Sequence, residues 1–153
     1  MKNPLNISIR LRPQRDFIQR AQLAELHSLA EHWLHELAFY GDEVRFFFHL
    51  VDKYFILLLK ESDINEAQII VANIHALGKD VKDIQAQAQR HLSWIDKSYT
   101  KEGLYNNEEE FREEHQQLED DLTELVANFK VVKREVFSLS SKMLEVEKLS
   151  HFL

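Results

Sequence analysis

Cysteine is absent from this chain of 153 residues, and proline and glycine are scarce. The missing cysteines exclude disulfides, thiolate metal ligands and a thiol nucleophile. The only prolines are Pro4 and Pro13, so residues 14–153 contain none. Because proline removes a backbone donor and interrupts a helix, so long a stretch without it favours long, unbroken helices.

The sequence also lacks the motifs of common enzymes and membrane proteins. It contains no glycine-rich phosphate loop and no Gly-x-Ser-x-Gly sequence, and no residue stands out as catalytic. The longest uninterrupted apolar run, residues 54–59, is much shorter than the roughly 20 residues that span a bilayer. The residues after Lys2 include no apolar segment typical of a secretory signal. We therefore expect a cytoplasmic protein without an integral membrane segment, and favour a non-enzymatic role.

Charge is distributed unevenly along the chain. The formal net charge of −7 argues against general binding to nucleic acid. Residues 1–20 carry five basic side chains and one acidic one, whereas residues 104–125 carry nine acidic side chains and one basic one. The acids can simply complement a helix dipole. A second hypothesis is that the basic arm docks on this acidic segment, or that residues 108–124 contact a protein partner.

Apolar residues recur at alternating spacings of four and three along three segments, each of which we call a seam. This heptad spacing places them on one face of an α-helix and is typical of coiled-coil packing. We expect helices over residues 25–60, 63–99 and 107–150, with the first able to begin near residue 14. The seams are Leu26, Ala30, Trp33, Leu37, Tyr40, Val44, Phe47, Val51, Tyr54 and Leu58; Ile70, Ile74, Leu77, Val81, Ile84, Ala88, His91 and Ile95; and Phe111, His115, Leu118, Leu122, Leu125, Phe129, Val132, Val136, Leu139 and Met143.

Short connections between these segments predict antiparallel neighbours. Asp63, with Glu66 three residues later, resembles a capping box, and Gly103 marks the second turn. We therefore predict an all-α fold: an elongated antiparallel three-helix bundle that forms one domain over residues 14–153. Residues 1–13 form an extended or helical arm. Turns centred near residues 62 and 103 would also place Gly78 level with Phe46 or Phe47.

The first predicted helix has more apolar surface than two neighbouring helices can cover. Apolar residues lie on both sides of its seam and extend over most of its circumference. A helix of this kind is either central or covered by another chain. We therefore predict a homodimer built on this helix, with Phe39, Phe46, Phe48 and Phe55 in the interface.

The same pairing of helices brings histidines to one layer. His91 lies about 12 residues before the second turn and His115 about 12 after it, so these two seam residues should face each other. Across the first turn, His32 and Glu36 reach the same level, and Glu119 is one turn beyond His115. Imidazoles and carboxylates between helices are ligands for iron, zinc or manganese.

Two interpretations of this layer follow. In the first, His91 and His115 are core residues that hydrogen-bond to each other, to Glu36 or to Tyr99, and the protein needs no cofactor. In the second, His32, Glu36, His91, His115 and Glu119 hold iron, zinc or manganese, in the style of hemerythrin-like and ferritin-like bundles. The chain departs from those families because it has no Glu-x-x-His pair and no His-x-x-x-His pair.

Overall fold

The computed structural model describes residues 22–57, 61–98 and 108–150. These residues form helix α2 (Leu23–Tyr54), the 3-10 helix η2 (Phe55–Leu57), helix α3 (Glu61–Ser98) and helix α4 (Glu108–Ser150). No strand occurs among them. Each of the three segments in which apolar spacing predicted a helix contains one, with α2 beginning at Leu23, α3 at Glu61 and α4 at Glu108.

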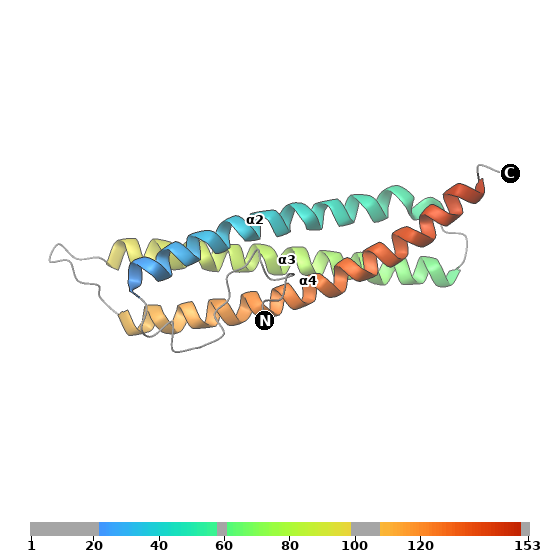
Figure 1. Ribbon diagram of the computed structural model, residues 1–153. Helices are drawn as coiled ribbons and strands as arrows, with labels where there is room; N and C mark the ends of the chain where they lie inside the picture. Colours follow the sequence, from blue (N-terminus) through green and yellow to red (C-terminus); the bar gives the residue numbers. More distant parts are fainter. Residues whose placement is uncertain (1–21, 58–60, 99–107, 151–153) are drawn as a thin grey trace, which may run out of the picture. The chain divides into compact units, whose positions relative to one another are not determined.

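Figure 1 shows helices α2, α3 and α4 as ribbons. Residues of all three helices contribute to two compact units. Among the described residues, unit 1 comprises residues 22–40, 81–98 and 108–124, and unit 2 comprises residues 41–57, 61–80 and 125–150. Each unit therefore takes one part of α2, one of α3 and one of α4, which pack on one another. The prediction of an all-helical fold in which three helices pack against each other is therefore confirmed for the described residues. Coiled-coil packing and the single domain over residues 14–153 stay predictions.

The predicted seams are the core of both units. Every seam residue whose side chain is described is buried, from Leu26 to Val51 on α2, from Ile70 to His91 on α3 and from Phe111 to Met143 on α4. Tyr54, Leu58 and Ile95 lie outside the described side chains. Apolar spacing alone therefore identified the inward faces, because removal of this surface from water is the main force that holds the helices together.

Contacts within each unit establish the direction of the helices. In unit 2, Asn73 on α3 contacts Glu135 on α4 at 3.3 Å. Seven residues earlier on α3, Glu66 accepts a hydrogen bond from Lys142, seven residues later on α4, at 2.7 Å. Since the residue numbers of the contacts decrease along α3 as they increase along α4, the two helices are antiparallel in this unit. In unit 1, His91 lies against His115 and Trp94 against Phe111, which gives the same direction.

The pairing of α2 with α3 differs slightly from the predicted pairing. Gly78 packs against Val44, because a Cβ added to this glycine would lie 3.3 Å from Val44 Cγ1. The expected neighbours were Phe46 and Phe47, about a turn further along α2. Helix α3 also begins at Glu61, before the start that the capping box suggested. Gly78 thus allows α2 to approach α3 closely at Val44.

Replacement of Gly78 by alanine tests this close approach. Alanine favours a helix by about 1 kcal/mol over glycine, but here its methyl group would press on Val44. We expect Gly78→Ala to stabilise the Val44→Ala variant by about 1 kcal/mol and the parent by less. Urea unfolding of the four members of this double-mutant cycle measures the difference. Equal effects in the two backgrounds would show that Val44 does not limit the space at residue 78.

The remaining expectations about the fold concern the ends of the chain and the membrane. The predicted arm over residues 1–13 and its docking on the acidic segment lie outside the described residues. Helix α4 begins with Glu108, Glu109 and Glu110, where acids complement the positive end of the helix dipole. Within the described ranges, no helix is long and apolar enough to cross a membrane.

Candidate functional site

Two fully buried histidines form the most unusual feature of unit 1. His91 on α3 and His115 on α4 are both 0% exposed, and the His91 Nε2 and His115 Nδ1 atoms are 2.9 Å apart. Charged and polar groups are rarely buried unless they are paired. The prediction that these two seam histidines face each other is therefore confirmed, as is the hydrogen bond between them in the core interpretation.

Glu114 connects the pair to the protein surface. Its Oε1 atom lies 2.7 Å from His91 Nδ1, and its side chain is 48% exposed. His91 therefore donates from Nδ1 to Glu114. When both imidazoles are neutral, the His91 Nε2 atom then accepts a hydrogen bond from His115 Nδ1–H. The three side chains form one continuous network from the core to solvent.

Aromatic rings enclose the histidine pair. Phe111 stacks on His91 with a centroid separation of 4.0 Å and an interplanar angle of 7°. Trp33 on α2 lies against His115 with ring centroids 4.6 Å apart. Within the described part of the chain, the Trp33 Nε1 and His115 Nε2 atoms are buried and have no hydrogen-bond partner. Each such group costs about 1–3 kcal/mol, so this layer is less favourable than an apolar one.

Burial governs the protonation of both rings. For His115, burial and then the positive charges of His91 and Arg112 lower the pKa to about 3. For His91, burial lowers the pKa, although the hydrogen bond and the charge of Glu114 oppose this effect. Both imidazoles are therefore neutral at neutral pH.

The other candidate metal ligands occupy separate positions. The His32 Nε2 atom lies 3.7 Å from Glu36 Oε1 on the surface of α2, and these side chains are 36% and 18% exposed. Glu119 is buried on α4. Among the residues that the structure describes, no three His, Asp or Glu side chains form a group that could hold a metal ion. The metal site formed by His32, Glu36, His91, His115 and Glu119 thus stays a prediction, and elemental analysis of purified protein would test it.

Sequence reasoning missed the residue that completes the histidine network. Glu36 and Tyr99 were the expected partners, but Glu114 contacts His91, and Tyr99 lies outside the described residues. Glu114 is one of nine acids between residues 104 and 125, so composition does not distinguish it. Its position beside His115 on α4, across from His91, is the signal that could have identified it.

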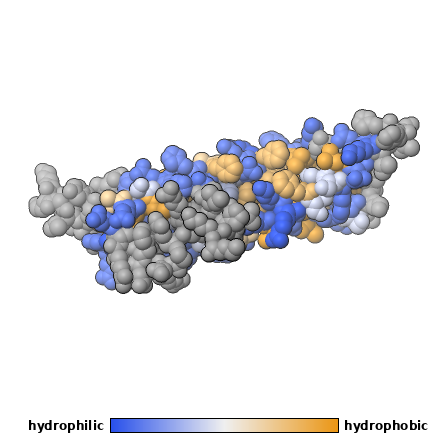
Figure 2. Space-filling model, viewed as in Figure 1, coloured by the Kyte–Doolittle hydropathy of each residue, from blue (hydrophilic) through white to orange (hydrophobic). Residues whose placement is uncertain are grey.

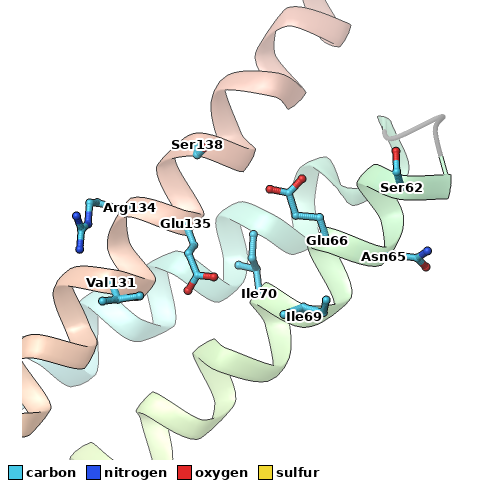
Figure 3. Close-up of a pocket in the computed structure, with 9 residues that line it drawn as sticks. All are labelled: Ser62, Asn65, Glu66, Ile69, Ile70, Val131, Arg134, Glu135 and Ser138. Carbon is cyan, nitrogen blue, oxygen red and sulfur yellow. The ribbon is translucent and has the colours of Figure 1, made fainter.

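Two grooves lie between α3 and α4, one in each unit. The groove in unit 1 is next to the histidine network, and Glu114 is in its wall; its other residues are Gln87, Arg90, Trp94, Gln117, Leu118 and Asp121. In unit 2, Ile69 and Ile70 from α3 face Val131 and Glu135 from α4 across the second groove (Figure 3). Ser62, Asn65, Glu66, Arg134 and Ser138 complete it.

Unit 2 also carries an exposed cluster of aromatic rings. Phe47 is 0% exposed and contacts Phe129 and Phe137 on α4, with centroid distances of 5.5 and 6.1 Å. The ring centroid of Phe46, the neighbouring residue on α2, lies 6.3 Å from that of Phe47. Phe46 and Phe137 are 53% and 45% exposed, and so is Leu144 at 45%. We call Phe46, Phe137 and Leu144 the apolar patch; Figure 2 shows hydrophobic side chains gathered over this part of α2 and α4.

The predicted interface residues differ in their exposure. Phe39, in unit 1, and Phe46, in unit 2, are more than half exposed. Phe48 is half-buried against His75 of α3, with ring centroids 5.0 Å apart, and Phe55 is half-buried. Phe137 and Leu144 were not predicted, although their separation of seven residues beside the α4 seam is a detectable signal.

No protein-family model matches the chain, and comparison with curated proteins and with solved structures found no match.

Proposed function

We propose that this protein is a non-enzymatic interaction protein that forms a homodimer through the apolar patch of unit 2. The observation that carries the proposal is the half-exposed state of Phe46 and Phe137, whose rings both lie close to the ring of the buried Phe47. Contiguous exposed apolar surface of this kind marks interaction sites in soluble proteins. Aromatic residues are enriched at such interfaces because they remove a large area from water.

The charges around the patch favour a second copy of this chain as the partner. On α2, Asp42, which lies one turn before Phe46, forms an ion pair with Arg45, the residue directly before Phe46. On α4, the Lys133 Nζ atom lies 5.7 Å from the centroid of the Phe137 ring. A twofold axis brings identical patches together, so a border of a single sign would repel itself. The side chains around the apolar patch carry both positive and negative charges, so two copies can associate without repulsion between borders of a single sign.

The dimer would leave the acidic segment 108–124 of α4 available to a protein partner. Glu108, Glu109 and Glu110 are exposed, and Glu108 pairs with Arg112. A basic surface on a partner protein would complement these charges and accelerate association. The cytoplasm is the location that we propose for this interaction.

Sedimentation equilibrium of the full chain tests the dimer directly. We expect a mass of about 36 kDa, twice the monomer mass of 18.2 kDa, at micromolar concentrations. Dilution should produce a concentration-dependent shift towards the monomer. A mass of 18.2 kDa throughout the series would contradict the proposal.

A further inference from the structure

The two units differ in what lies at their centres. Unit 1 holds the pair His91 and His115, both 0% exposed. In unit 2, the described histidines are His49 and His75, and both are exposed. The core of unit 2 is instead made of aliphatic side chains, Met143, the rings of Phe47 and Phe129, and the buried hydroxyl residue Ser140.

From this difference we propose that unit 1 is an acid-sensitive element: mild acid opens it locally while unit 2 stays folded. The geometry disfavours extra protons on the histidine pair in the closed unit. The two imidazoles share one hydrogen bond of 2.9 Å, so a proton added to His91 leaves His115 with its Nε2–H buried and without an acceptor in the described part of the chain. A proton on each ring would place two donors and two positive charges face to face.

The charged groups around the histidine pair do not make an added proton favourable in the closed unit. Glu114 stabilises a proton on His91, but it contacts that ring alone. His27, from α2, disfavours a positive charge on His91, and Arg112, from α4, disfavours one on His115. Glu119, one turn beyond His115, is buried on α4, and Arg90, beside His91 on α3, is exposed. Opening of the unit releases both imidazoles to water, where they accept protons freely.

Proton linkage gives the sign and the size of the effect. A histidine whose pKa is lowered in the folded state contributes stability that is fully present above its unfolded pKa of 6.5 and is lost as the pH falls below that value. Between about pH 7.5 and about pH 5, one imidazole that stays neutral in the closed unit raises the ratio of open to closed states by about 30-fold. His115 supplies this factor, and His91 adds to it.

Hydrogen exchange of the full chain at these two pH values is the test. After correction for intrinsic exchange rates, we expect amides of the unit 1 core, in residues 26–40, 84–94 and 111–122, to exchange at least about 30-fold faster at the lower pH. Core amides of unit 2 should change much less. Equal acceleration in both units, or none in either, would overturn the proposal.

Two variants and one titration test whether the acid sensitivity of unit 1 comes from His91 and His115. The double variant His91→Gln/His115→Leu should lose the acceleration in unit 1, whereas the matched control His49→Gln/His75→Gln should keep it. If the first variant does not fold, NMR titration of the parent decides: the ring signals of His115 should stay those of a neutral imidazole until unit 1 opens. Titration of His115 near its ordinary pKa within the closed unit would contradict the proposal.

Discussion

Replacement of Phe47 by alanine is expected to lower the free energy of unfolding by about 3–5 kcal/mol. The Phe47 side chain is 0% exposed and its ring contacts both Phe129 and Phe137. Removal of the ring loses its burial and leaves a cavity that helices held by other contacts cannot fully close. Because domains of this size are stable by only about 5–15 kcal/mol, a loss of this size should also lower Tm clearly.

Urea unfolding followed by circular dichroism measures the change, and the adjacent Phe48→Ala variant is the matched control. Phe48 lies on the same helix but is half-buried, with a single described ring contact across to α3, His75. We expect its replacement to cost about 1–2 kcal/mol, less than that of Phe47. Similar losses in the two variants would mean that Phe47 is not at the centre of the unit 2 core.

Replacement of Phe46 by aspartate is expected to weaken the proposed dimer by roughly 1000-fold. A central aromatic residue at an interface contributes about 2 kcal/mol or more, and a symmetric dimer contains the substitution twice. The aspartate would also place a charge against the apolar patch of the second copy. Since Phe46 is 53% exposed in the monomer, the fold should survive the change.

Sedimentation across a dilution series measures this effect, with Ile69→Asp as the control. Ile69 is more exposed than Phe46, at 62%, and lies in unit 2, but it lines the groove between α3 and α4 and not the apolar patch. The control should dimerise like the parent. If both variants dissociate to the same extent, the interface is elsewhere on unit 2; if neither dissociates, the patch has no role in association.

The inward faces of the helices were predictable because one physical effect determines them. Apolar residues at spacings of four and three must share a face, and that face must be removed from water. The pairing of His91 with His115 followed from the same spacing and from the position of the second turn. The structure confirms both predictions.

The partners of surface residues were less predictable, because they depend on how far one helix is turned towards its neighbour. Phe48 was assigned to the dimer interface, and its contact with His75 of α3, which leaves it half-buried, was not foreseen; its place in the interface stays a prediction. Glu114 contacts His91 from an acidic stretch in which sequence alone favours no particular side chain. Phe137 was overlooked because it lies directly beside the seam of α4. At that position a shift of one residue along the helix separates a buried side chain, Val136, from an exposed one.

The most direct test of the proposed function is an isotope-filtered NOE experiment on a mixture of labelled and unlabelled chains. It detects only contacts between two copies. The account predicts intermolecular NOEs from the ring protons of Phe46 and Phe137, together with the methyl groups of Leu144. Intermolecular NOEs confined to other surfaces, or none at concentrations where the parent has the dimer mass, would contradict the assignment of the apolar patch as the interface.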